Sequence, residues 1–244
     1  MAEAARRRRG WLPATLVVLA LLLLTWGADV LARVGAESLV AQDVQAATGV
    51  AEAPVVEIDG RFFLPQVVRG AYGRVHVSAR GLRNGPLVVA SLDADLTDVR
   101  VPFHDVLVRD VRAVGVGHSE ETAVLTYPAL NAYLEATGRP LTVAPGPDGE
   151  GVTLTGSVEV LGKQVDASAD VTLSVADGNL RLTPQAITTS GSLIGDAAQL
   201  LLGQRLSVAV PLGSLPFSQR LTAVRPTAEG LVVQAAGDAV VLQP

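Results

Sequence analysis

The chain lacks cysteine and has few aromatic residues. None of its 244 residues is cysteine, and aromatics make up 4% of the chain against 49% for all hydrophobic residues. Without thiols there are no disulfides or thiolate metal sites, and three histidines are the only soft ligands. With so few rings the core must be built from Val, Leu and Ala, which favours β-strands because branched side chains fit a pleated surface.

Positive charge is scarce beyond the first nine residues. The formal net charge is −5, but four of the 19 basic residues stand together at Arg6 to Arg9. Without these and Glu3, the chain has 15 basic and 23 acidic residues, a net charge of −8. Nucleic-acid backbones are bound through basic surface, so we expect no nucleic-acid partner. Simple electrostatic adsorption to anionic lipid is disfavoured for the same reason.

One long apolar run follows the arginines. No charge occurs from Gly10 to Ala28, and roughly 20 apolar residues match the hydrocarbon thickness of a bilayer. Because basic residues stay on the cytoplasmic side, we predict a cytoplasmic tail over residues 1–9 and a transmembrane signal-anchor over 10–28. Residues 29–244 then form the exported domain. Trp11 and Trp26 stand near the two ends of the run, where aromatic rings favour the membrane interface.

A cleaved signal peptide is the alternative to an anchor. It would need a shorter apolar region and a small-x-small cleavage site. The nearest candidate, Val30-Leu31-Ala32, has Asp29 and Arg33 beside it and is a poor site. We therefore favour a single-pass protein of the inner (plasma) membrane with its domain in the periplasm or cell envelope. Cleavage would instead release that domain into the envelope.

Beyond the apolar run, the residue pattern predicts helix and then strands. Residues 28–48 lack proline and precede Gly49, which predicts a helix that packs on the domain. From Pro54 onward apolar and polar residues alternate, as in antiparallel strands with one buried face. The clearest alternating runs are Arg74 to Leu82, Leu92 to Leu96, Val152 to Val160, Val165 to Val175, Leu180 to Thr183 and Leu231 to Ala235.

Two short helices are expected to interrupt the strands, at Tyr127 to Thr137 and at Leu193 to Leu202, each followed by glycine. The fold class is therefore α+β: an N-terminal transmembrane or signal helix, then a long helix packed on an antiparallel sheet. Small residues that face inward on the strands would leave space beside the sheet, for a lipid or for a closely packed helix. They are Gly156, Ala167 and Ala169.

No residue pattern predicts catalysis, a metal or a cofactor. The G-x-S-x-G turn of serine hydrolases is missing. His76, His104 and His118 lack the helical spacing of a metalloprotease site. Asp93 and Asp95 alternate with apolar residues on a strand, without the glycine and distal glutamate of a calcium loop. We expect a protein that is not an enzyme, and a glycolipid hydrolase or transferase is the weakest alternative.

Two segments combine aromatic residues with Leu and Pro. One runs from Glu57 to Gly70 as E-I-D-G-R-F-F-L-P-Q-V-V-R-G, and the other runs from Val210 to Phe217. The first resembles the I-D-G-F-P-F-L-T-Q signature of the LmeA-like family of exported phospholipid-binding proteins. The resemblance extends from about Ala36 to the C-terminus. It departs from the family where Phe62 replaces a proline and Pro65 follows the leucine.

The resemblance implies a fold similar to tubular lipid-binding domains, in which a strongly curved antiparallel sheet wraps around a long helix and encloses an apolar groove. It also implies binding of phospholipids, including phosphatidylinositol-type lipids, and a part in lipoglycan mannan synthesis. The expected function is to hold, present or transfer a phospholipid at the outer face of the inner membrane. The alternative is a scaffold that binds an envelope protein or polymer.

The candidate lipid contacts are the apolar residues of the Leu-Pro-aromatic segments and of the helix expected near residue 193. They are Phe62, Phe63, Leu64, Phe103, Leu193, Ile194, Leu215 and Phe217. The candidate headgroup donors are the arginines beside the first segment, Arg61, Arg69 and Arg74. Burial of acyl methylenes is favourable by about 0.8 kcal/mol each, so aliphatic contacts suffice for affinity.

Overall fold

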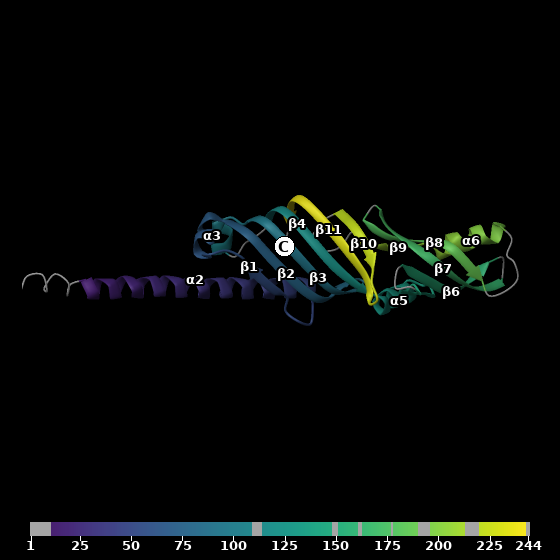
Figure 1. The fold of residues 1–244 in the computed structure, drawn as a ribbon, viewed down its shortest axis with the longest axis horizontal. Coiled ribbons are helices and arrows are strands. Elements are labelled where there is room, and N and C mark those ends of the chain that lie inside the picture. The colour runs from purple at the N-terminus through teal and green to yellow at the C-terminus, as the bar shows by residue number, and fades with distance from the viewer. Residues whose placement is uncertain are drawn as a thin grey trace, which may run out of the picture.

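The computed structural model describes residues 11–108, 114–147, 151–160, 163–176, 178–189, 196–212 and 220–242. Two antiparallel sheets follow each other along the long axis of the molecule, and the N-terminal helix projects from one end (Figure 1). The fold is α+β, as the alternation of apolar and polar residues predicts.

Helix α2 is continuous from Trp11 to Thr48. Its first half projects beyond the domain (Figure 1), and the large side chains from Leu16 to Leu24 are 53–69% exposed. This half is long and apolar enough to cross a membrane. The second half packs on the first sheet through Ala32, Ala36 and Ala41. The helix ends at Gly49 (φ +66°), the predicted position.

The first sheet is a curled half-barrel of six strands. Its strand order is β1 (Val55–Ile58), β2 (Ala71–Asn84), β3 (Leu87–Arg100), β4 (Val114–Thr126), β11 (Gly230–Leu242) and β10 (Arg220–Pro226). Alternate residues are buried on the inner face of most of these strands, whereas β10 has no buried residue. In β3, for example, Leu92, Ala94 and Leu96 are buried and the residues between them are not. The second half of α2 contacts this inner face over β1, β2 and β3.

The register of β3, β4 and β11 is interrupted at Asp98, Gly117 and Ala239, which the pairing of these strands skips. Asp98 and Ala239 both have φ +52°, which is uncommon for residues with a Cβ. A Cβ on Gly117 would lie 2.8 Å from that of Asp98, so only glycine fits between the two strands. The alternation of buried residues along β3 also shifts here by one position, because Val99 and not Asp98 is the next buried residue after Leu96.

The second sheet has five strands and two helical neighbours. Its order is β5 (Leu141–Pro145), β6 (Val152–Val160), β7 (Lys163–Ala176), β8 (Asn179–Thr189) and β9 (Val208–Pro211). Helix α5 (Tyr127–Ala136) packs between β5 and the first sheet, and α6 (Asp196–Leu206) packs on β6 and β8. Gly156 leaves no gap on its inner side. The Leu141 side chain and the Pro140 carbonyl, at the beginning of β5, occupy the space that a side chain at residue 156 would need. Ala167 and Ala169 are buried in the same core as Leu202 and Leu206 of α6.

Three details differ from the sequence-based predictions. Two short helices, α3 (Leu64–Arg69) and α4 (Phe103–Val108), were not among the predicted elements. The predicted stop of α6 at Gly203 is wrong, because the helix continues to Leu206. Burial of Leu206 stabilises by about 1.5–3 kcal/mol, which exceeds the cost of about 1 kcal/mol for a glycine inside a helix.

Candidate functional site

The segment that carries the family signature forms a loop and a short helix at the end of the domain from which α2 projects (Figure 1). Gly60 has φ +137°, and the Gln66 side-chain amide occupies the position that a Cβ at residue 60 would take. That amide donates hydrogen bonds to the carbonyls of Asp59 (3.1 Å) and Phe62 (3.0 Å). The glycine and the glutamine of the signature are therefore a matched pair that closes the loop.

Asp29, immediately after the apolar run, binds the end of this loop through hydrogen bonds. Its carboxylate accepts hydrogen bonds from the backbone N–H groups of Phe63 (2.8 and 2.9 Å) and Leu64 (2.8 Å), and it is buried. These hydrogen bonds, that of Phe63 first, lower the pKa of Asp29 below its ordinary value; burial opposes them and Arg33 adds to them. The carboxylate stays ionised and holds the start of α3 against α2.

Two more side chains of α2 bind the same segment. Arg33 donates to the Gly60 carbonyl (2.5 Å), and Glu37 accepts from the backbone N–H of Ile58 (2.9 Å). Asp29, Arg33 and Glu37 are spaced four residues apart, so they share one face of the helix. This i, i+4, i+8 row of charges is visible in the sequence, but the sequence-based predictions did not include it.

The two adjacent phenylalanines have different environments. Phe63 is 3% exposed and its ring lies 6.2 Å from that of Tyr72, in a small core with Ile58, Leu96 and Val99. Phe62, one residue earlier, is 52% exposed. Phe63 is therefore part of the core, and only Phe62 is accessible to a ligand or a membrane.

Further exposed apolar side chains lie on the two short helices that follow Phe62. Leu64 and Val68 belong to α3 and are 39% and 67% exposed, and Phe103 at the start of α4 is 38% exposed. Helices α3 and α4 are adjacent because the Val101 N–H donates to the carbonyl of Gly70, the residue that ends α3 (3.0 Å). We name this set, Phe62, Leu64, Val68 and Phe103, the apolar corner.

The three predicted headgroup arginines lie in the same part of the chain and are exposed. Arg61 precedes Phe62, and Arg69 is in the last turn of α3. Arg74 is on β2, and its carbonyl accepts from the N–H of Asp59 in the signature loop (3.0 Å). The other candidate lipid contacts, Leu193, Ile194, Leu215 and Phe217, lie outside the residues that the structure describes.

Pro65, the departure from the family signature, has a plain structural explanation. It lies in the first turn of α3, a position where the missing N–H of proline leaves no hydrogen bond unmade. The aromatic-leucine pair before it, Phe63-Leu64, keeps both backbone N–H groups for Asp29. The substitution therefore leaves the attachment of the loop to α2 intact.

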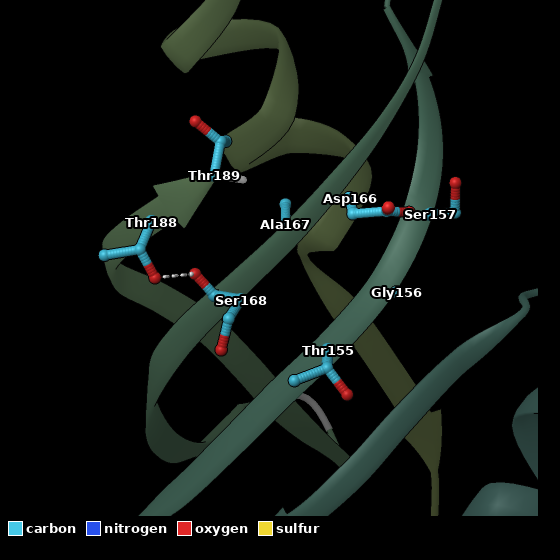
Figure 2. A pocket seen from close by; sticks show the side chains of 8 residues that line it. All are labelled: Thr155, Gly156, Ser157, Asp166, Ala167, Ser168, Thr188 and Thr189. Carbon is cyan, nitrogen blue, oxygen red and sulfur yellow. Dashed lines mark hydrogen bonds between the residues drawn. The ribbon is translucent and has the colours of Figure 1, made fainter. Parts of the chain in front are cut away.

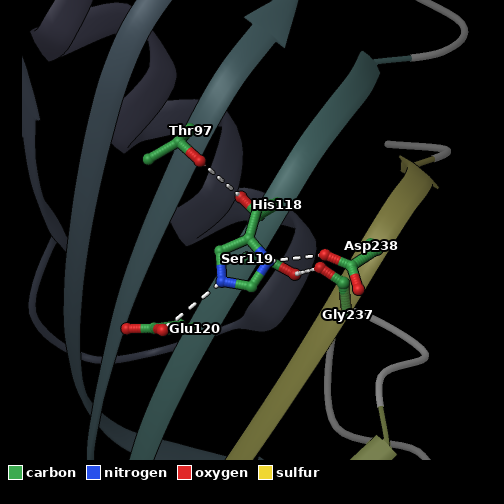
Figure 3. Close-up of polar contacts among 6 residues, drawn as sticks. All are labelled: Thr97, His118, Ser119, Glu120, Gly237 and Asp238. Atoms are coloured by element: carbon green, nitrogen blue, oxygen red, sulfur yellow. Dashed lines mark hydrogen bonds and ion pairs between the residues drawn. The ribbon is translucent and has the colours of Figure 1, made fainter.

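The histidines lie on exposed surfaces. His76 Nδ1 is 3.1 Å from Asp95 Oδ1 across β2 and β3, and His104 is exposed on α4. His118 lies between Asp238 Oδ1 (2.6 Å from Nδ1) and Glu120 Oε1 (3.3 Å from Nε2), as Figure 3 shows. These carboxylates, Asp238 first, raise the pKa of His118. Among the described residues no group of three or more His, Asp or Glu has a metal-binding arrangement.

A polar hollow of about 540 Å³ opens on the second sheet (Figure 2). Its lining is mostly hydroxyl side chains, with one carboxylate and two small residues: Thr155, Gly156, Ser157, Asp166, Ala167, Ser168, Thr188 and Thr189. The Thr188 hydroxyl donates to the Ser168 carbonyl (3.2 Å), so part of this surface is bonded within the sheet. Within the part of the chain that the structure describes, none of the candidate lipid contacts lines this hollow.

Comparison with known proteins agrees with the signature. A family model described as LmeA-like phospholipid-binding matches residues 27–236. The matched region begins two residues before Asp29 and includes α3, α4, the second sheet and the first sheet as far as residue 236 of β11. No curated protein matches the chain.

Proposed function

Because the match covers most of its length, the chain belongs to the LmeA-like phospholipid-binding family, and we propose that it holds a phospholipid at the apolar corner. In this proposal the apolar corner contacts the acyl chains. Arg61, Arg69 and Arg74 supply the cations for the phosphate. The family name covers phospholipid binding, and we assign the protein no catalytic step.

One observation carries the proposal: exposed apolar side chains and exposed arginines share one short segment. From Arg61 to Arg69, the chain presents Phe62, Leu64 and Val68 between two cations. A phospholipid needs both kinds of contact, because acyl chains are favourably buried against apolar surface and phosphate is bound by guanidinium groups. The net charge of −8 beyond the N-terminal arginines makes a local cluster of this kind more distinctive.

The proposal includes an uncleaved anchor. Cleavage after Ala32 would separate Asp29 from the domain, and the N–H groups of Phe63 and Leu64 would lose their carboxylate acceptor. The helix also continues without a break through this site. We therefore propose that α2 stays attached, with residues 1–9 in the cytoplasm and residues 29–244 as the domain in the cell envelope.

In that position the protein presents or transfers a lipid at the outer face of the inner membrane. We propose a phosphatidylinositol-type lipid as the ligand and support of lipoglycan mannan synthesis as the cellular task. Both the ligand and the task follow from the resemblance of the signature segment to the LmeA-like family.

The test compares bound phospholipid between matched variants of the full-length protein. Phe62→Ser combined with Val68→Ser changes the apolar corner, and Val88→Ser combined with Leu200→Ser changes exposed apolar residues elsewhere. After washing in detergent, native mass spectrometry should find about one phospholipid on the wild type and on the control, and less on the corner variant. Equal retention by all three proteins would contradict the corner as the binding site.

The headgroup preference and the anchor have separate measurements. Arg61→Gln with Arg69→Gln should weaken uptake of phosphatidylinositol more than uptake of phosphatidylcholine, whereas Arg83→Gln, at an exposed site on the same strand as Arg74, should change neither. The intact mass of the membrane-extracted protein reports on cleavage. A mass that lacks the residues before Arg33 would contradict the anchor.

A further inference from the structure

The apolar corner is a patch of four large side chains that face water in the isolated protein. Phe62 and Val68 are more than half exposed, and Leu64 and Phe103 more than a third. Several large exposed apolar side chains in one part of a surface mark an interaction site more often than single ones do. The position of the apolar corner along α2 indicates what contacts it.

Asp29 sets that position. The uncharged run, residues 10–28, ends immediately before Asp29, which binds the corner. At 1.5 Å per residue, 19 residues of helix span about 28 Å, close to the hydrocarbon thickness of about 30 Å. Asp29 therefore lies at the boundary between the core and the headgroup layer, which is about 5–8 Å thick on each side. The corner stands at the depth of the headgroups when this run fills the core.

The attachment between the helix and the corner is direct. Asp29 accepts from Phe63 and Leu64, and Arg33 donates to Gly60, so both sides of Phe62 are bound to α2. Gln66 ties the Phe62 carbonyl to α3 as well. The corner cannot move far from α2 without loss of these hydrogen bonds.

The residues around the corner suit a membrane interface. Trp26, 62% exposed on α2, precedes Asp29 by one turn, and tryptophan favours the interface. Arg61 and Arg69 lie beside the apolar side chains, as in interfacial segments whose apolar face is buried among lipids while the cations meet phosphates.

We propose that the apolar corner is a second membrane contact, inserted in the headgroup layer of the bilayer that α2 enters. This inference rests on the proposed anchor. Two contact points, the helix and the corner, fix the rotation of the domain about α2 and keep the end of the first sheet against the lipid surface. The contact gives the domain access to a lipid that is still in the bilayer.

The absence of cysteine makes the test simple. Single cysteines at Phe62, Val68 and Phe103 of the full-length protein carry an environment-sensitive fluorophore, and the labelled protein is placed in nanodiscs of phosphatidylcholine with some phosphatidylglycerol. Doxyl-labelled phosphatidylcholine quenches near the headgroup or near the chain end, depending on the position of the doxyl group. Leu19→Cys reports on the anchor, and Leu200→Cys, at an exposed leucine on α6 at the opposite end of the molecule (Figure 1), is the control.

The expected result is strong shallow quenching at the corner. Labels at 62, 68 and 103 should lose about half or more of their emission to the headgroup-level quencher and less to the chain-end quencher, because interfacial groups reach only about 5–10 Å into the boundary. The label at 19 should respond to the deep quencher, and the label at 200 to neither.

Each other outcome overturns the inference in a recognisable way. If the label at 19 is quenched and the corner labels behave like the label at 200, the anchor stands and the second contact is wrong. If neither the label at 19 nor the corner is quenched, both are wrong. Corner quenching that saturates at one doxyl lipid per protein means a single bound lipid, which supports the proposed binding site and contradicts insertion in the bilayer.

Discussion

The carboxylate of Asp29 accepts hydrogen bonds from the backbone N–H of Phe63, 34 residues later in the chain, at 2.8 and 2.9 Å. This contact joins the residue that follows the apolar run to the centre of the family signature. Because of it, the apolar helix α2 and the candidate lipid site form one structural unit. Substitutions at either end of the contact should therefore alter the same loop.

Replacement of Asp29 should loosen the signature loop. In Asp29→Ala the N–H groups of Phe63 and Leu64 lose their acceptor, and we expect their amide hydrogens to exchange roughly tenfold faster, the scale of one lost hydrogen bond. Asp43→Ala changes an exposed carboxylate on the same helix and should leave both amides unchanged. Hydrogen exchange read by mass spectrometry makes the comparison, and equal protection in both variants would refute the role of Asp29.

The same contact should be acid-sensitive. The folded protein lowers the pKa of Asp29 from its ordinary 3.8, so the contact stabilises above that value and is lost as the pH falls through the lower folded pKa. Protection of the Phe63 amide relative to that in Asp29→Ala should therefore be constant at neutral pH and should decline only below about pH 4. A decline that begins near pH 6 would show that another group is responsible.

Gly70 should tolerate alanine less well than another glycine in the same conformation. It has φ +63°, and a Cβ there would lie 2.6 Å from the Val101 carbonyl oxygen, in the segment that joins α3 to α4. Gly138, after α5, has φ +74° and no atom within 4 Å of the same position. We expect Gly138→Ala to cost about 1 kcal/mol for the left-handed backbone alone, and Gly70→Ala to cost about 2–4 kcal/mol because backbone atoms must also move. The two losses of stability are compared by thermal unfolding of each detergent-solubilised variant.

The two phenylalanines of the signature should respond in opposite ways. Phe63→Ala leaves a cavity beside Tyr72 and should lower the free energy of unfolding by about 3–5 kcal/mol. Phe62→Ala, at a half-exposed site, should change it by less than about 0.5 kcal/mol and should reduce lipid retention instead. Denaturant unfolding and lipid retention are measured on each variant. A large loss of stability in Phe62→Ala would mean that this ring is a core residue.

His118 should stabilise the first sheet at acidic pH. Asp238 and Glu120 raise its pKa above the ordinary 6.5, so the stabilisation is complete below that value and is lost as the pH rises through the folded pKa. The stability difference between the wild type and Asp238→Asn should therefore be larger at about pH 5.5 than at about pH 8.5. His104→Asn, on α4, is the control and should leave that difference unchanged. The opposite pH trend would contradict the ion pair.

Regular elements were the most predictable part of this fold. The alternation from Val152 to Val160 predicted β6 with its observed bounds, and Gly49 ended α2 where the glycine stop indicated. Both signals are local, because a strand or helix with one buried face repeats its pattern in consecutive residues. Helices α3 and α4 escaped prediction because six residues are too few to show a helical period.

The amino-acid sequence by itself determined the apolar run, the acidic and cysteine-free domain, the α+β class and the family signature, because composition, period and motif are read along the chain. Only the tertiary structure decided that Phe63 belongs to the core while Phe62 faces outward, and that Asp29 holds the start of α3 against α2. These roles depend on contacts between residues more than 30 positions apart. The choice of which ring is buried is made by the inner face of the sheet, which forms only when β2, β3 and α2 come together.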